Sequence, residues 1–254
     1  MGAGHQHQLY RAGDTLVHRL PPQCKLAAVA AFALVVVATP REWLWVFCLY
    51  AALLAGAAAV ARVPPGFVLR RMAVEIPFVV FAVALPFIGL GERVSLLGVS
   101  LSAEGLWSAW NILAKATLGV AASVLLAATT EPRLMLLGAQ RLRLPPLLVQ
   151  IAMFMLRYMD VIVDEMRRMR VARESRGFTA RDVRHIPVVA KSAGALFIRS
   201  YERGERVHLA MLSRGYSGSM PVIQDLSASS RQWLVAGMLP GVALVALLGT
   251  WGLA

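Results

Sequence analysis

Five long apolar runs, separated by short polar segments, constrain this chain more than any other feature of its sequence. The runs cover residues 26–39, 43–61, 72–90, 106–130 and 232–254. An α-helix rises about 1.5 Å per residue, so about 20 apolar residues cross the hydrocarbon core of a bilayer. The first run is short, and residues 20–25 are expected to complete it, with Lys25 reaching towards the headgroups. The pattern predicts an all-α integral membrane protein with about five transmembrane helices.

The distribution of charge predicts the orientation in the membrane. The chain has 254 residues, is 58 % hydrophobic and carries a formal net charge of +12, a composition that excludes an ordinary soluble domain. If the N-terminus is cytoplasmic, all lysines and arginines except Arg41, Arg93 and Lys115 lie on or at the edge of the cytoplasmic side. We therefore expect a multi-pass protein of the inner (cytoplasmic) membrane. Its basic surface suits anionic lipid or an acidic partner, and no nucleic acid is needed to explain it.

Two long segments between the fourth and fifth runs end in the same short sequence. Residues 172–178 read Ala-x-x-Ser-Arg-Gly-aromatic, and residues 210–216 repeat the pattern. Each copy closes a segment in which apolar residues recur at steps of three and four, which predicts an amphipathic helix. A glycine just past a helix adopts the left-handed conformation that ends it. One copy alone would be an ordinary helix end, but two copies on paired helices favour a repeated docking device.

The repeated sequence places an arginine at the tip of each predicted helix. A guanidinium at a rigid tip can pair bidentately with a carboxylate in a groove of a partner protein. Two equivalent tips suit a partner with two equivalent grooves, such as a dimer. The predicted coupling residues are Ser175, Arg176, Gly177, Ser213, Arg214 and Gly215.

Two charged residues within the apolar runs are the candidate functional residues inside the membrane. Glu75 lies near the cytoplasmic end of the third run and Lys115 lies well inside the fourth. A charge in a membrane span is costly and usually marks function or a buried pair. For Lys115 three interpretations stay open: a structural role by snorkelling or pairing, contact with another membrane subunit, and transport.

The sequence contains none of the motifs that would indicate an enzyme. It has no phosphate-binding loop, no His-Glu-x-x-His helix, no Cys-x-x-Cys and no Gly-x-Ser-x-Gly elbow. Cys24 and Cys48 are too few for a disulfide framework or a metal site. We therefore expect no catalytic residue, no metal site and no directly bound cofactor.

With these features the chain resembles the T component of energy-coupling factor (ECF) transporters, and most closely the cobalt-type CbiQ family. The likeness rests on the lead-in at residues 17–26, the five spans, and the two helices that end in Arg-Gly. Family members carry Ala-Arg-Gly at these tips, where this chain has Ser175 and Ser213 in place of the alanine. The resemblance implies that the tips sit in grooves of two ATP-binding-cassette ATPases, which bind the ATP. It also implies that the T component passes ATP-driven motion to a membrane substrate-binding subunit, here for cobalt.

The predicted organisation has four parts, and the functional alternatives stay open beside it. The parts are a cytoplasmic lead-in (1–25), a four-helix membrane region (26–130), a cytoplasmic coupling region (131–226) and a last span (227–254). One alternative is a T component shared by several vitamin-binding subunits. Another is an autonomous secondary carrier that uses Glu75 and Lys115. A membrane enzyme is the weakest alternative.

Overall fold

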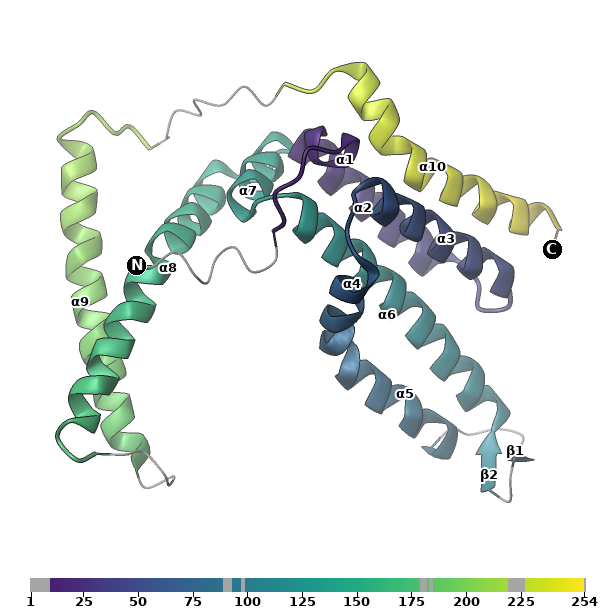
Figure 1. Cartoon of the computed structure of the whole chain (residues 1–254), viewed down its shortest axis with the longest axis horizontal. Coiled ribbons are helices and arrows are strands. Elements are labelled where there is room, and N and C mark those ends of the chain that lie inside the picture. The colour runs from purple at the N-terminus through teal and green to yellow at the C-terminus, as the bar shows by residue number, and fades with distance from the viewer. Residues whose placement is uncertain are drawn as a thin grey trace. The chain divides into compact units, whose positions relative to one another are not determined.

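In the computed structural model, the chain divides into two compact units (Figure 1). The structure describes residues 10–88, 93–96, 99–178, 182, 185–218 and 227–253. Of these described residues, those within 10–142 and 227–253 belong to the larger unit, and those within 143–218 belong to the smaller unit. The described elements are helices, apart from one antiparallel hairpin of β1 (Arg93–Leu96) and β2 (Val99–Ser102). The prediction of an all-α membrane protein is therefore confirmed.

Each predicted apolar run forms a helix of the larger unit. Its elements are α1 (Leu16–Arg19), α2 (Pro22–Ala38), α3 (Leu44–Val60), α4 (Pro65–Arg71), the 3-10 turn η1 (Met72–Glu75), α5 (Ile76–Ile88), α6 (Ala103–Thr129), α7 (Pro132–Arg141) and α10 (Ser230–Leu253). Proline stands at the first position of α2, α4 and α7. The amide that proline lacks has no partner at that position of a helix, and its fixed φ angle suits the first turn.

The structure corrects the predicted membrane spans in two respects: the lengths of the first two helices and the start of the third span. Pro65–Ile88, Ala103–Thr129 and Ser230–Thr250 are long and apolar enough to cross a membrane, whereas α2 and α3 are shorter apolar helices of 17 residues each. The third span was predicted to begin at Met72, after a basic loop. In the structure this span begins at Pro65, because Pro65 occupies the first position of α4. A 3-10 turn, η1 at Met72–Glu75, lies within this span.

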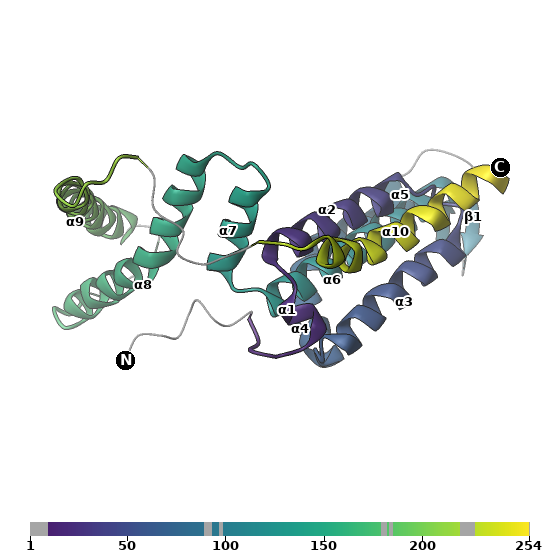
Figure 2. The same ribbon diagram turned by 90° about the horizontal axis from the view of Figure 1, so that it is seen from above.

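The core of the larger unit lies where α2, α3, α6 and α10 meet (Figure 1, Figure 2). Tyr50 of α3 is fully buried, and its ring lies edge-on to Phe32 of α2 at 5.8 Å between centroids. The Tyr50 hydroxyl donates a hydrogen bond to the Ala243 carbonyl of α10 at 3.1 Å and lies 3.1 Å from Thr39 Oγ1. A buried hydroxyl without a partner would cost about 1–3 kcal/mol, so this bond fixes α10 against α3.

A second constraint on the larger unit is a polar junction where the N-terminal segment meets the end of α6. Lys25 is only 6 % exposed, and its ammonium donates to the Thr129 carbonyl at 2.9 Å and to the His18 carbonyl at 3.3 Å. The Arg11 amide donates to the Ala128 carbonyl at 3.0 Å. The prediction that Lys25 reaches towards the headgroups is wrong, because its ammonium is buried against the Thr129 carbonyl at the end of α6 and the His18 carbonyl of α1. A cation there also complements the helix dipole.

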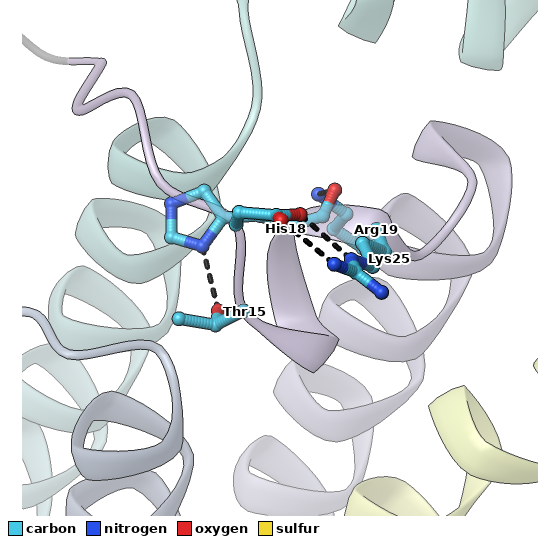
Figure 3. A network of polar contacts seen from close by, with 5 residues as sticks. Thr15, His18, Arg19 and Lys25 are labelled. Carbon is cyan, nitrogen blue, oxygen red and sulfur yellow. Dashed lines mark hydrogen bonds and ion pairs between the residues drawn. The ribbon is translucent and has the colours of Figure 1, made fainter.

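His18 and Asp14 stiffen the segment that carries this junction. Thr15 Oγ1 lies 2.7 Å from His18 Nδ1 (Figure 3). His18 Nε2 donates to the Arg11 carbonyl at 3.1 Å. Asp14 accepts two hydrogen bonds from Arg19, at 2.6 and 2.7 Å. On the other side of the junction, a Cβ at Gly138 of α7 would come within 2.9 Å of the Gln23 nitrogen. The junction thus joins the start of α2, the end of α6 and α7.

The smaller unit consists of two long helices, α8 (Pro146–Glu174) and α9 (Ile186–Leu212), which pack against each other. Glu165 of α8 is 14 % exposed and pairs with Arg199 of α9 at 2.5 Å and with Arg168 at 2.8 Å. By length and hydropathy alone, α8 also reaches the level of a membrane span. The two long helices are therefore confirmed, while their position on the cytoplasmic side stays a prediction.

Replacing Lys25 by methionine should destabilise the larger unit, because two carbonyls at the junction lose a buried donor. We expect a loss of about 1–3 kcal/mol in the free energy of unfolding. Thermal unfolding of the purified protein in detergent measures it. Lys191→Met is the matched control, because Lys191 lies on the exposed surface of α9. Equal stability of the two variants would contradict the role of the junction.

Acid should weaken the same junction through His18. Burial lowers the pKa of His18. The unfolded chain therefore binds this proton more readily, and stability present at neutral pH is lost as the pH falls below about 6.5, the ordinary imidazole value. Asp14 titrates in a more acidic range, because its hydrogen bonds from Arg19 lower its pKa. We expect a smaller drop in Tm between about pH 7.5 and pH 5.5 for His18→Gln than for wild type. Identical drops would exclude His18 as the titrating group.

Candidate coupling site

Both long helices end in the same hydrogen-bonded cap. In the first tip (Ser175–Phe178) the Gly177 amide donates to the Glu174 carbonyl at 3.0 Å, and the Phe178 amide donates to the Arg173 carbonyl at 3.1 Å. In the second tip (Ser213–Tyr216) the equivalent bonds reach Leu212 and Met211, both at 3.0 Å. This pair of bonds is the Schellman motif, in which backbone amides satisfy the last carbonyls of a helix.

The glycine of each tip has the backbone conformation that the sequence predicted. Gly177 has φ of 77° and Gly215 has φ of 81°. Residues with a Cβ adopt this left-handed region at a cost of roughly 1–2 kcal/mol. No neighbouring atom lies within 4 Å of where a Cβ would stand at either glycine. Backbone conformation therefore selects glycine at both tips, and the space around each tip is open to an approaching partner.

The serines that depart from the Ala-Arg-Gly pattern are accommodated inside the caps. Ser175 Oγ donates to the Ala172 carbonyl at 3.1 Å, and Ser213 Oγ donates to the Ala210 carbonyl at 3.0 Å. Each hydroxyl thus turns back onto its own helix.

The arginine of each tip is exposed. Within the part of the chain that the structure describes, neither Arg176 nor Arg214 takes part in a side-chain hydrogen bond or an ion pair. Because backbone amides already satisfy the helix carbonyls, the guanidinium groups are not needed for capping. Each is available for a carboxylate of another molecule.

The aromatic residues that end the two tips make different contacts, which the sequence analysis did not predict. Phe178 lies edge-on to His185 at 5.1 Å between centroids. Tyr216 packs near His208 at 6.4 Å, and its hydroxyl donates to Gln150 Oε1 at the start of α8 at 2.7 Å. The second tip is thereby tied to α8. The sequence carries one sign of this difference: the second copy ends in Tyr216, which has a hydroxyl group, and the first copy ends in Phe178, which has none.

A mostly apolar groove lies between the two helices of the smaller unit. It has a volume of about 360 Å³ and is lined by Phe154, Tyr158, Ile162, Ser200, Arg203, Gly204, Val207, His208 and Met211. No atom lies within 4 Å of where a Cβ would stand at Gly204, so the space beside this part of α9 is open. The helix pair is therefore in contact along only part of its length.

The two charged residues of the membrane region have separate partners. Glu75 on η1 is 5 % exposed and accepts a hydrogen bond from Thr117 Oγ1 of α6 at 2.5 Å. Lys115 of α6 donates to the Val37 carbonyl, near the end of α2, at 2.8 Å. Positions 115 and 117 are about 200° apart around a helix, so α6 presents them to different neighbours. The structure does not bring Glu75 and Lys115 together, and any function of either residue stays a prediction.

Among the described residues, no three His, Cys, Asp or Glu side chains cluster in a way that could hold a metal ion. An apolar helical unit, connected in sequence to a helix pair with two matching arginine tips, defines a helical membrane protein. The family model described as cobalt transport protein, CbiQ, matches residues 13–223, and the chain belongs to this family.

Three relatives extend this result. The ECF transporter transmembrane protein EcfT of Lactococcus lactis subsp. cremoris is 26 % identical over 226 residues, 82 % of this chain and 83 % of that protein. The cobalt transport protein CbiQ of Rhodobacter capsulatus is 27 % identical over 179 residues, 70 % of this chain and 71 % of that protein. An uncharacterized protein of Methanocaldococcus jannaschii is 34 % identical over 123 residues, which are 46 % of this chain but only 44 % of that protein.

Replacing Gly177 or Gly215 by valine should loosen the tip that carries it. The left-handed conformation is strained for a residue with a Cβ by roughly 1–2 kcal/mol, so amides of the last turn should exchange about tenfold faster. Hydrogen exchange followed by mass spectrometry measures this. Gly194→Ala, inside α9 with no atom within 4 Å of the added Cβ, is the control and should not speed exchange. Unchanged exchange at the valine tips would show that the cap does not depend on glycine.

Proposed function

We propose that this chain is the transmembrane coupling subunit, or T component, of an ECF-type ATP-binding-cassette importer. It passes ATP-driven motion from two cytoplasmic ATPases to a membrane substrate-binding subunit, with cobalt ion as the transported substrate. The observation that carries the proposal is the pair of identically capped helix tips, each with an exposed arginine that the cap does not use. The names of the relatives, EcfT and CbiQ, support the same assignment.

The geometry of the tips suits docking into two equivalent grooves. Arg176 and Arg214 each offer a fork of N–H donors that matches a carboxylate. Gly177 and Gly215 leave room beside the arginine for the wall of a groove. Two tips of the same backbone geometry fit two ATPase subunits related by a two-fold axis. ATP itself stays on the ATPases, and this chain contributes no catalytic group.

The smaller unit is built to transmit movement. At about 1.5 Å per residue, α8 and α9 are rods of roughly 40 Å that end in the docking tips. The ion pair between Glu165 and Arg199 joins the rods, and Tyr216 joins the second tip to Gln150. A displacement of either tip is therefore shared by both helices. In this proposal the N-terminus and both tips are cytoplasmic, as the distribution of basic residues predicts.

The choice of cobalt rests on the family description and on the relative named as a cobalt transport protein. A T component that serves several vitamin-binding subunits would have the same tips and differ only in its membrane partner. Uptake of cobalt by cells that express the chain with its neighbouring subunits, compared with uptake of nickel and of vitamins, separates these outcomes.

An autonomous carrier is the alternative from a different class. Such a carrier would use Glu75 and Lys115 along one pathway. Glu75 is instead hydrogen-bonded to Thr117, and Lys115 is hydrogen-bonded to the Val37 carbonyl. This arrangement favours structural roles for both residues. ATP-independent uptake by the purified chain alone in liposomes would support the carrier and exclude the coupling function.

The charge-reversed variant Arg176→Glu/Arg214→Glu should lose the ATPases while still folding. Reversing a charge at a docked carboxylate leaves two like charges together, and each contact should lose about 2–5 kcal/mol of binding free energy. Co-purification from detergent with the neighbouring ATPase subunits measures the loss. Arg167→Glu/Arg206→Glu is the control, because it changes charge equally on the same helices away from the tips. Equal recovery of the complex with both variants would refute docking through the tips.

A further inference from the structure

Two polar contacts between α8 and α9 lie at opposite ends of the groove in the smaller unit. The groove is lined by side chains between positions 154 and 162 of α8 and between positions 200 and 211 of α9. At one end, Glu165 of α8 forms its ion pair with α9. At the other end, the Tyr216 hydroxyl donates a hydrogen bond to Gln150 Oε1 at 2.7 Å. Tyr216 therefore joins the two helices at the end of the groove where the second tip lies.

Tyr216 is held firmly on the second tip. Its amide donates to the Met211 carbonyl at 3.0 Å within the cap, and its ring lies edge-on to His208 at 6.4 Å between centroids. Arg214 stands two positions before it in the same cap, so the hydroxyl and the guanidinium belong to one rigid turn. On the other helix, Gln150 Nε2 is buried without a hydrogen bond among the described residues, and Tyr216 thus supplies the hydrogen bond of the Gln150 side chain.

The first tip has no equivalent of this hydrogen bond. Phe178 has no hydroxyl, and its ring lies against His185, the residue just before α9. That contact is local, because it joins the end of one helix to the start of the next along the chain. The hydrogen bond between Tyr216 and Gln150 joins residues 66 positions apart. The two tips thus have the same cap but differ in what a displacement of each would reach.

Gln150 lies close to the connection between α8 and the larger unit. Helix α8 begins at Pro146, and residues 142–145 join it to α7. The first tip follows the other end of this 29-residue helix, roughly 40 Å away at about 1.5 Å per residue. Energetic coupling passes through contiguous contacts. A displacement of the second tip that reaches Gln150 therefore enters α8 beside α7, whereas one of the first tip has to pass along the whole of α8.

We propose that Tyr216 is the positioning residue through which the second tip acts on the membrane region. Its hydroxyl, bonded to Gln150, passes a displacement of Arg214 to the start of α8. The two tips dock alike but are not equivalent in transport. Without the hydroxyl, the end of α9 swings about the ion pair at Glu165, and the displacement is absorbed within the smaller unit. This inference rests on the proposed coupling function.

The test uses the complete transporter in liposomes, with ATP hydrolysis and uptake measured on the same vesicles. The substrate is the one, among cobalt, nickel and vitamins, for which wild type shows ATP-driven uptake. Tyr216→Phe keeps the ring and the cap, so it should bind the ATPases and hydrolyse ATP as wild type does. Uptake per ATP hydrolysed should fall about fivefold, the factor that one ordinary hydrogen bond contributes to a local equilibrium.

Tyr201→Phe is the matched control. Tyr201 is on the same helix, is 61 % exposed and makes no hydrogen bond among the described residues. Its variant loses the same hydroxyl group and should keep the uptake per ATP of wild type. An equal loss in both variants would overturn the role of Tyr216.

A double variant separates positioning from stability. Gln150→Leu/Tyr216→Phe replaces both hydrogen-bond partners by apolar groups, a change that can leave folding stability nearly unaltered. We expect this variant to keep the Tm of wild type in detergent and to be as poorly coupled as Tyr216→Phe. Recovery of wild-type coupling would assign the loss in Tyr216→Phe to the unpaired Gln150 amide and overturn the positioning role.

The failure of this inference is distinguishable from the failure of the coupling function. Wild-type uptake per ATP in Tyr216→Phe, with the ATPases bound, would overturn the role of Tyr216 and leave the coupling function standing. A wild-type chain that binds no ATPases, or that supports no ATP-driven uptake, would refute the coupling function and this inference with it.

Discussion

The requirement that buried polar groups find hydrogen-bond partners where water is scarce governs the larger unit. Its buried or membrane-embedded polar side chains satisfy it by donating to carbonyls of other helices. Lys25 donates to Thr129, Lys115 to Val37 and Tyr50 to Ala243. Each bond joins residues distant in sequence, so each also fixes one helix against another. In an apolar interior these bonds supply specificity that uniform hydrophobic contact cannot.

The smaller unit meets the same requirement in the opposite way. At the ends of α8 and α9, backbone amides of the Schellman caps satisfy the carbonyls, and the serine hydroxyls add a further bond within each helix. The side chains of Arg176 and Arg214 are therefore not needed to satisfy these carbonyls. Lys25 and Lys115 are committed to internal carbonyls, whereas Arg176 and Arg214 remain exposed. This contrast separates the charges that hold the protein together from those suited to bind a partner.

The two units thereby suit different tasks within a transporter. The larger unit is fixed by hydrogen bonds between its helices. The smaller unit is a pair of long helices joined at Glu165 and at Tyr216, with a groove between them. A stable membrane unit and a lever with docking tips are the parts that a coupling subunit needs.

The sequence by itself determined the apolar helices, the two long amphipathic helices and the left-handed glycines of the tips, because periodicity and capping are local properties. It did not determine that Lys25 is buried, since its acceptor at Thr129 lies 104 residues away. The start of the third span at Pro65 was missed although its signal, the Pro64-Pro65 pair, is local. The sequence also did not determine the Glu75–Thr117 and Tyr216–Gln150 hydrogen bonds. Only the tertiary structure decides these, because the partner of a polar group depends on which helices pack together, and no local pattern carries that information.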